Sequence, residues 1–185
     1  MIALFGLMFQ ACNNTKKDST AAADSVNAVK DTTTTGLTGI AVDKDDAKFA
    51  VDAANGGMTE IALSKLAVEK TANSKIKDFA NMMVMDHSKA GDELKAIATK
   101  KSITLPDSLN ADSKKAVEDM RKKAGDDFDK AYVSKMKADH KATVNMFEDG
   151  VKKIKDPDLN AFVVKTLPTI KGHLTAINTI SDSMK

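Results

Sequence analysis

Apolar residues recur every three or four positions along most of the chain after residue 45. This spacing puts them on one face of an α-helix and leaves polar residues on the opposite face. Four long segments carry the pattern, at 49–67, 76–97, 128–154 and 159–180. No segment alternates apolar and polar residues as a half-buried β-strand does. The pattern therefore predicts four long amphipathic helices and no sheet.

The connections between these segments predict how the helices are arranged. Two joins are short, near 72–74 and 155–157, and a short join makes the flanking helices antiparallel neighbours. The middle connection is long and contains a short charged helix at about 112–124. We predict an all-α domain over 45–185, a ferritin-like four-helix bundle with a long crossover carrying a short extra helix. An up-down bundle with an extra helix in one loop is the alternative.

The composition agrees with a helical core and argues against some classes of function. Hydrophobic residues make up 42% of the chain but aromatic residues only 4%, so the core must come mainly from aliphatic residues and Met, which suit helices. The net charge of +2, without a basic stripe that contains aromatic residues, argues against a nucleic-acid partner. The chain contains no G-x-S-x-G, P-loop or H-E-x-x-H motif. These features favour a non-enzymatic role.

The first twelve residues predict a lipoprotein signal. The apolar run IALFGLMF is too short to span a bilayer but matches the core of a secretory signal. It is followed by QAC, which resembles a bacterial lipobox, in which the cysteine receives lipid and becomes the mature N-terminus. We therefore expect residues 1–12 to be a signal peptide ending at lipidated Cys12. No Lys or Arg precedes the apolar run, as one would in a typical signal peptide. Two alternatives therefore stay open: the true start codon lies further upstream, or this segment is buried in the fold.

The next segment, residues 13–44, is rich in Thr, Ala, Asp and Ser and lacks periodic apolar positions, so we expect a flexible tether. Lipid on Cys12 would attach this tether, and with it the domain, to a membrane. Asn13 does not match the Asp that retains some lipoproteins in the inner membrane. The sequence thus predicts an outer-membrane-anchored lipoprotein of the bacterial cell envelope, facing the periplasm or the cell surface. It identifies no protein partner.

Every histidine of the chain lies on one of the apolar faces. His87 and His140 each follow a Met of the same face by four residues, and His173 lies on the apolar face of the last segment. Glu60 has a similar position in the first segment, three residues before Leu63. Each of these residues is near the middle of its helix, and mid-helix positions share one level in a bundle of similar helices. We expect the four helices to bring one carboxylate and three imidazoles into one layer.

Two hypotheses explain such a layer. Imidazoles and a carboxylate suit Cu, Fe or Zn, and helical bundles build metal sites from side chains of facing helices. The first hypothesis is therefore a transition-metal site formed by Glu60, His87, His140 and His173. The alternative is a structural or protein-interaction domain without a ligand, in which the same groups form a buried hydrogen-bond network that fixes the helix register.

Three further side chains lie close to the expected layer. Asp86 and Asp139 each precede a histidine by one residue and are therefore about 100° around the helix from it. They can orient a histidine of the next helix by accepting its N–H, or they can face Lys89 and Lys141 on the surface. Tyr132, the single tyrosine, lies about two turns before the histidine of its segment and either hydrogen-bonds into the layer or is half exposed.

Three stretches resemble a known family: FAVDAANGGMTEIALSKLAVEKTANSKIKDFANMMVMDHSKA, FDKAYVSKMKADHKATVNMFE and LPTIKGHL. Over about 47–180 the chain is similar to the bacterial family called domain of unknown function 4142, whose members are often labelled predicted outer-membrane proteins. The resemblance implies a ferritin-like fold without an established activity. It implicates Glu60, Asp86, His87, Tyr132, Asp139, His140 and His173. This chain differs from di-iron bundle proteins, which carry a Glu-x-x-His motif. Val84 and Lys137 occupy the positions at which that motif has Glu.

Overall fold

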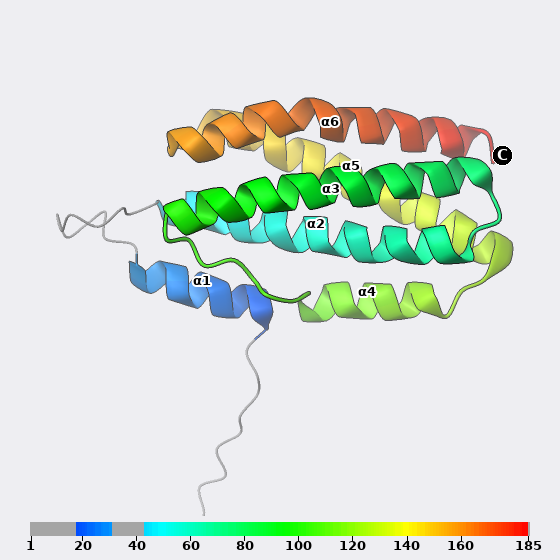
Figure 1. The fold of residues 1–185 in the computed structure, drawn as a ribbon, viewed down its shortest axis with the longest axis horizontal. Coiled ribbons are helices and arrows are strands. Elements are labelled where there is room, and N and C mark those ends of the chain that lie inside the picture. The colour runs from blue at the N-terminus through cyan, green and yellow to red at the C-terminus, as the bar shows by residue number, and fades with distance from the viewer. Residues whose placement is uncertain (1–17, 31–42, 185) are drawn as a thin grey trace, which may run out of the picture.

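The computed structural model describes residues 18–30 and 43–184, and this part of the chain is entirely helical apart from turns and loops. Its helices are α1 (Ser19–Lys30), α2 (Lys44–Lys70), α3 (Ser74–Lys100), α4 (Ala111–Arg121), α5 (Gly125–Lys153) and α6 (Pro157–Asp182) (Figure 1). The predicted all-α class is confirmed. None of the helices in the described ranges combines the length and the apolar character needed to cross a membrane.

Four long helices pack into a bundle. The hairpin of α2 and α3 lies against the hairpin of α5 and α6, so that α3 contacts α6 and α2 contacts α5. The segment between α3 and α5 crosses the full length of the bundle and carries α4, which packs on α2 and α5 (Figure 1). Because of this crossover, α3 and α5 run in the same direction, and each long helix is antiparallel to the neighbours it contacts.

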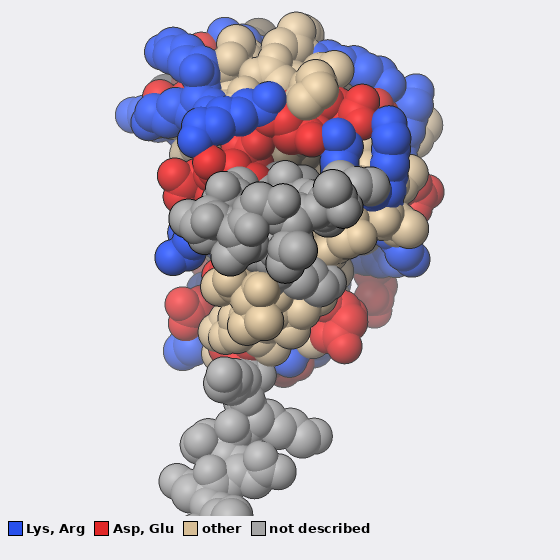
Figure 2. Space-filling view, turned by 90° about the vertical axis from the view of Figure 1, so that its left-hand side faces the viewer, with Lys and Arg blue, Asp and Glu red and all other residues tan. Residues whose placement is uncertain are grey.

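Side chains cap the N-termini of two of the long helices. The side chain of Asn73 accepts hydrogen bonds from the backbone of the first turn of α3, and that of Asp156 does the same for α6. At the end of the bundle where α6 begins, buried Asp46 of α2 accepts hydrogen bonds from the backbone N–H groups of Lys155 and Asp156. Lysine and carboxylate side chains are interspersed on this end surface (Figure 2), where Lys100 pairs with Asp158.

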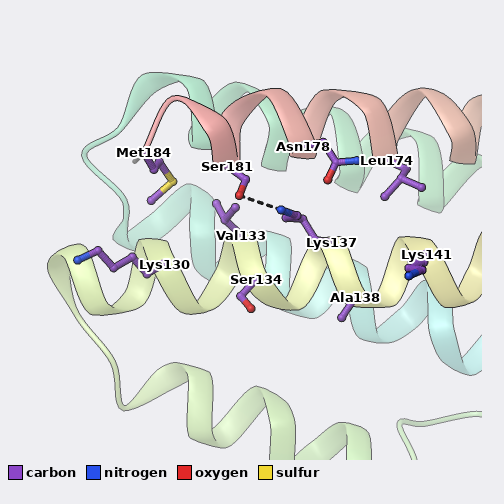
Figure 3. Close-up of a pocket in the computed structure, with 10 residues that line it drawn as sticks. All are labelled: Lys130, Val133, Ser134, Lys137, Ala138, Lys141, Leu174, Asn178, Ser181 and Met184. Carbon is purple, nitrogen blue, oxygen red and sulfur yellow. Dashed lines mark hydrogen bonds between the residues drawn. The ribbon is translucent and has the colours of Figure 1, made fainter.

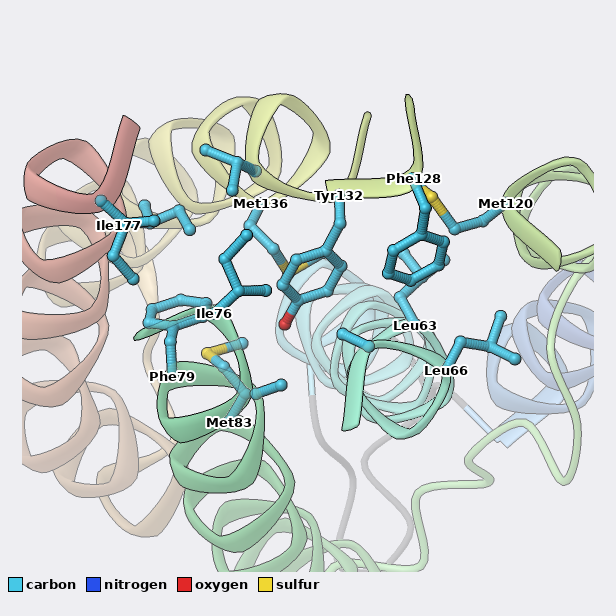
Figure 4. Packing of buried hydrophobic residues seen from close by; sticks show 14 of the residues in the cluster. Leu63, Leu66, Ile76, Phe79, Met83, Met120, Phe128, Tyr132, Met136 and Ile177 are labelled. Atoms are coloured by element: carbon cyan, nitrogen blue, oxygen red, sulfur yellow. The ribbon is translucent and has the colours of Figure 1, made fainter. Parts of the chain in front are cut away.

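The apolar interior consists of two clusters, one toward each end of the bundle. One cluster brings together Leu63, Phe79, Phe128 and Tyr132 from α2, α3 and α5, with the Phe128 and Tyr132 rings stacked at 6.2 Å (Figure 4). The other includes Leu94 and the residues Ala47, Phe49, Ala50, Ala98, Ile103, Val144, Phe147, Leu159, Phe162, Val163 and Ile170. Each of the four long helices contributes to both clusters and passes from one to the other near its middle.

The prediction of a flexible tether at 13–44 is wrong for Ser19–Lys30, which form the helix α1. This helix packs against α2 and buries Ala23 and Asn27, which are one turn apart. The Asn27 side chain donates a hydrogen bond to the Thr104 carbonyl (2.9 Å) and accepts one from the Thr104 N–H (2.7 Å). The sequence pattern missed this helix because its contacts come from Ala and Asn rather than from large apolar residues.

The predicted apolar segment at 128–154 forms most of α5, although Val151, in the last turn of this helix, is 37% exposed. The predicted signal segment with Cys12 and the remainder of the predicted tether, at 13–17 and 31–42, lie outside the described residues.

Candidate metal centre

Each long helix places one polar side chain at the level where it passes between the two apolar clusters. Glu60 lies on α2, His87 on α3, His140 on α5 and His173 on α6. Glu60, His140 and His173 are buried, and His87 is mostly buried, with 11% of its side chain exposed. The predicted convergence of one carboxylate and three imidazoles from four helices is therefore confirmed.

The three imidazoles are close enough to share one ion. Their ring centroids are 5.4 Å apart for His87–His173 and for His140–His173, and 5.9 Å apart for His87–His140. One ring nitrogen from each lies within 4.8 Å of the others. An ion that binds nitrogen at about 2.0–2.1 Å brings two ligand atoms to within roughly 3–4 Å of each other, so small rotations of the rings suffice.

Glu60 faces two of the imidazoles. Its Oε2 is 3.3 Å from Nε2 of His87, and its Oε1 is 3.4 Å from Nδ1 of His140. Neither Oε1 of Glu60 nor Nε2 of His87 has a hydrogen-bond partner, so these contacts bring the atoms close without the alignment of a hydrogen bond. The carboxyl group thus lies at the edge of the group of three imidazoles.

Burial keeps Glu60, His87 and His140 uncharged at neutral pH. It raises the pKa of Glu60 to about 8, with the nearby Asp139 charge raising it further and Lys135 opposing the shift. It lowers the pKa of His87 to about 3, helped by the other two histidines, and that of His140 to about 4. The contacts between Glu60 and the imidazoles therefore join neutral groups at pH 7. Neutral imidazole is also the form that binds a metal.

Hydrogen bonds outside the cluster fix the tautomers of two rings. Nδ1 of His140 lies 2.9 Å from the Met136 carbonyl, which can only accept, so Nδ1 carries the hydrogen. Nε2 of His173 lies 2.9 Å from the carboxylate of Asp86 on α3, so Nε2 carries the hydrogen there. In each ring the other nitrogen keeps its lone pair, as a metal ligand requires.

The lone pairs left by these tautomers have no partner. Among the described residues, Nε2 of His140, Nδ1 of His173, Nε2 of His87 and Oε1 of Glu60 are buried polar atoms without a hydrogen bond. A buried polar atom without a partner costs about 1–3 kcal/mol, and few occur in a native domain. Four of them, one from each helix, meet at a single level, which is unusual for a satisfied structural network.

The side chains expected around the layer differ in what they contact. Asp86 reaches a histidine of another helix, as predicted. Asp139 instead pairs with Lys135 at 2.6 Å, one turn earlier on the same helix, and no contact with a histidine is found for it. The two surface lysines proposed as partners for these aspartates do not pair with them in the described structure, because the aspartates are directed elsewhere.

Tyr132 is fully buried and contacts Ser64 rather than a histidine. Its hydroxyl oxygen lies 2.9 Å from Oγ of Ser64, and burial raises the pKa of the phenol. Ser64 was not identified from the sequence, although it follows Glu60 by four residues and so shares its helix face. The Ser64–Tyr132 pair forms a second polar contact one turn away from the cluster.

A pocket of about 960 Å³ opens from the surface toward the cluster and is lined by residues of α2, α3, α5, α6 and the crossover. Glu60, His87 and His173 line it, whereas His140 does not. His140 therefore lies behind the three groups that face the pocket.

A second groove, between α5 and α6, is separate from the cluster. Figure 3 shows it, lined by Lys130, Lys137 and Lys141 around an apolar floor, with a hydrogen bond of 3.0 Å from Lys137 to Ser181. Its lining contains neither a carboxyl group nor a histidine, so it contributes no ligand to the candidate metal centre.

Comparison with known proteins places this arrangement in context. The family described as "Domain of unknown function (DUF4142)" matches residues 17–180, a range that includes α1. None of the proteins with curated descriptions matches the chain. A crystal structure of a DUF305 fragment from Deinococcus radiodurans is similar, with a TM-score of 0.67 and 10% identity, over 75% of this chain and 96% of that one. At this identity the similarity supports the fold alone.

Proposed function

The chain belongs to the family described as Domain of unknown function (DUF4142), and we propose that its domain binds one transition-metal ion between the four long helices. The ligands are His87, His140, His173 and Glu60. The observation that carries the proposal is the meeting of four buried atoms without hydrogen-bond partners, one from each of these residues. A shared ion is the one partner that satisfies all four atoms at once.

The ligand set favours Cu, Fe or Zn. Imidazole nitrogen suits these ions, and neither a thiolate, which would favour softer ions, nor a carboxylate-rich shell, which would favour Mg or Ca, is present among the described ligands. For a site of given geometry, Cu(II) binds most tightly among the divalent first-row ions. We expect Cu(II) to bind the isolated protein more tightly than Zn(II) or Fe(II).

The alternative is a structural or protein-interaction domain in which the same layer only fixes helix register. The contacts of 3.3 Å and 3.4 Å between Glu60 and two imidazoles support it, because after a small rotation a protonated carboxyl group could donate to Nε2 of His87 and accept from the Nδ1–H of His140. Such a network would leave the lone pair on His173 Nδ1 without a partner.

We also propose the setting in which this domain works. The run that ends at Cys12 supports a lipid anchor and a place in the bacterial envelope, facing the periplasm or the cell surface. The long crossover with α4, between two antiparallel hairpins, supports a ferritin-like connectivity. Metal handling or metal-dependent protection in the envelope is the role that combines these features.

Metal analysis tests the proposal directly. The metal-free, untagged full-length chain is equilibrated with Cu(II), Zn(II) or Fe(II), desalted and analysed by mass spectrometry. We expect about one ion per chain for the wild type and loss of binding in His140→Gln. Asn145→Ala, at an exposed position on the same helix, is the control and should bind as the wild type does. The proposal is wrong if the wild type retains no ion, or if His140→Gln binds as much as the wild type with equal affinity.

A further inference from the structure

The candidate metal centre has one side that opens to the large pocket. Of the four proposed ligands, Glu60, His87 and His173 line the pocket, and His140 lies behind them. A compact set of three imidazoles leaves the fourth position of a tetrahedral ion for another donor, as in catalytic zinc sites. Glu60 is the proposed ligand outside that set of three, and it lies at the pocket wall.

We propose that the three imidazoles hold the ion and that Glu60 occupies a replaceable position, which a small neutral nitrogen heterocycle can take by entering through the pocket. This inference rests on the proposed metal site and adds to it the class of molecule that the site binds. The pocket serves as a ligand-binding site that ends at the ion.

The charge on the pocket lining selects against anions. Besides Glu60, five carboxyl groups and three lysines line it. One of the lysines, Lys165, is already paired with Glu93 at 2.8 Å. The remaining excess of carboxyl groups raises the cost of bringing an anion such as azide toward the ion.

The deeper walls of the pocket favour an uncharged, compact ligand. Leu94, Phe147, Phe162 and Ile170 are buried apolar residues of its lining, contributed by three different helices. Apolar walls with a few polar groups at one end are typical of small-molecule sites. A neutral heterocycle can place its ring against these walls and its nitrogen lone pair toward the ion.

Two glycines on α2 keep this route open. Gly56 and Gly57 line the pocket four and three residues before Glu60, so each is about one turn away from it. A Cβ added at Gly56 would meet no atom within 4 Å, whereas a Cβ at Gly57 would lie 3.8 Å from Nδ1 of His87. A larger side chain at Gly56 can therefore fill the pocket without displacing the ligands.

The experiment uses imidazole as the probe and Co(II) as the ion. Co(II) takes the same ligands as Zn(II), and its visible absorption changes when a ligand is exchanged. The untagged, full-length wild type is loaded with Co(II) and titrated with imidazole. We expect a saturable spectral change, with cobalt still bound to the protein after dialysis, and a much weaker effect of azide.

The variant Gly56→Leu provides the decisive comparison. It should bind Co(II) with unchanged stoichiometry, but imidazole at least about tenfold more weakly. Gly172→Leu is the matched control: a Cβ there also meets nothing within 4 Å, and the residue is exposed on α6 outside the pocket lining. We expect it to bind imidazole as the wild type does.

Four results would overturn the inference. A loaded protein whose spectrum does not respond to imidazole, or a Gly56→Leu variant with wild-type imidazole affinity, removes the ligand site and leaves the metal site intact. Release of cobalt by imidazole shows that imidazole competes for the ion instead of joining the site. Failure to bind Co(II) at all instead refutes the metal site, and with it this inference.

Discussion

His173 on α6 donates its Nε2–H to Asp86 on α3 across 2.9 Å, and this hydrogen bond connects the two hairpins at the level of the cluster. It fixes the ring so that Nδ1 faces the other imidazoles. Replacing such an acceptor typically lowers metal affinity about 10- to 100-fold. We expect Asp86→Asn to weaken metal binding by that factor, as measured by competition with a chelator.

Asp139→Asn is the matched control for this prediction. Asp139 also precedes a histidine, but its carboxylate pairs with Lys135 and not with an imidazole. Its charge raises the pKa of Glu60, so its removal should leave metal affinity unchanged or slightly increased. Equal losses of affinity in the two variants would contradict the role assigned to Asp86.

Metal binding should release a proton from Glu60. Burial raises the pKa of this carboxyl group to about 8, so it is mostly protonated in the metal-free protein at pH 7 and must lose its proton to bind the ion. Because His87 and His140 are already neutral, we expect about one proton per metal ion. Calorimetric titrations in two buffers of different ionisation enthalpy measure this number. It should fall toward zero in Glu60→Gln, provided that the ion still binds to the three imidazoles.

The metal-free protein should be most stable near neutral pH. Burial lowers the pKa values of His87 and His140 from 6.5 to about 3 and 4, so the unfolded chain takes up protons first and stability falls as the pH drops below 6.5. The pKa of Glu60 is raised from 4.5 to about 8, so this group favours folding at low pH and its contribution is lost as the pH rises toward 8. Below pH 6.5 the two histidines lower the stability by more than the one carboxyl group raises it, so the net stability falls as the pH drops.

Thermal unfolding of the metal-free protein across this pH range measures both branches. We expect Tm to fall on either side of neutral pH in the wild type. Glu60→Gln should remove the fall on the alkaline side, and His140→Gln should reduce the fall on the acid side. A wild-type Tm that stays constant from neutral to alkaline pH would show that Glu60 is ionised in the folded state.

Asn27 should control the attachment of α1. Its side chain both donates to and accepts from the backbone of Thr104 in the crossover. We expect Asn27→Ala to cost about 1–3 kcal/mol of local stability, because it leaves backbone groups of the crossover without these bonds. Hydrogen exchange should become faster in Ser19–Lys30 while the four long helices keep their protection. Val29→Ala, at a position that is 85% exposed, is the control and should not change the exchange.

The periodic apolar pattern was sufficient to predict the four long helices, the crossover and the level of the cluster. These features depend on local spacing, and His87, His140 and His173 each lie between apolar residues that define a helix face. The cap at Asn73 is likewise a local feature, because a capping side chain contacts the residues that directly follow it.

The features that the sequence did not reveal depend on contacts between distant segments. Nothing near Asn27 indicates that Thr104 will lie beside it, and a helix that packs through alanine shows little contrast between its faces. Asp86 and Asp139 occupy equivalent positions before a histidine, but only Asp86 faces another helix that presents an imidazole. Such differences are set by the packing of helices, which spacing alone does not determine.

The layer between the two apolar clusters contains one group from every long helix, and neither cluster belongs to one hairpin alone. An ion at this layer would cross-link four segments that are far apart in the chain, much as several disulfides converging on one point would. Separating the hairpins would then require the ion to leave first. The concentration of free metal ion around the protein would therefore determine the rate at which proteases degrade the folded chain.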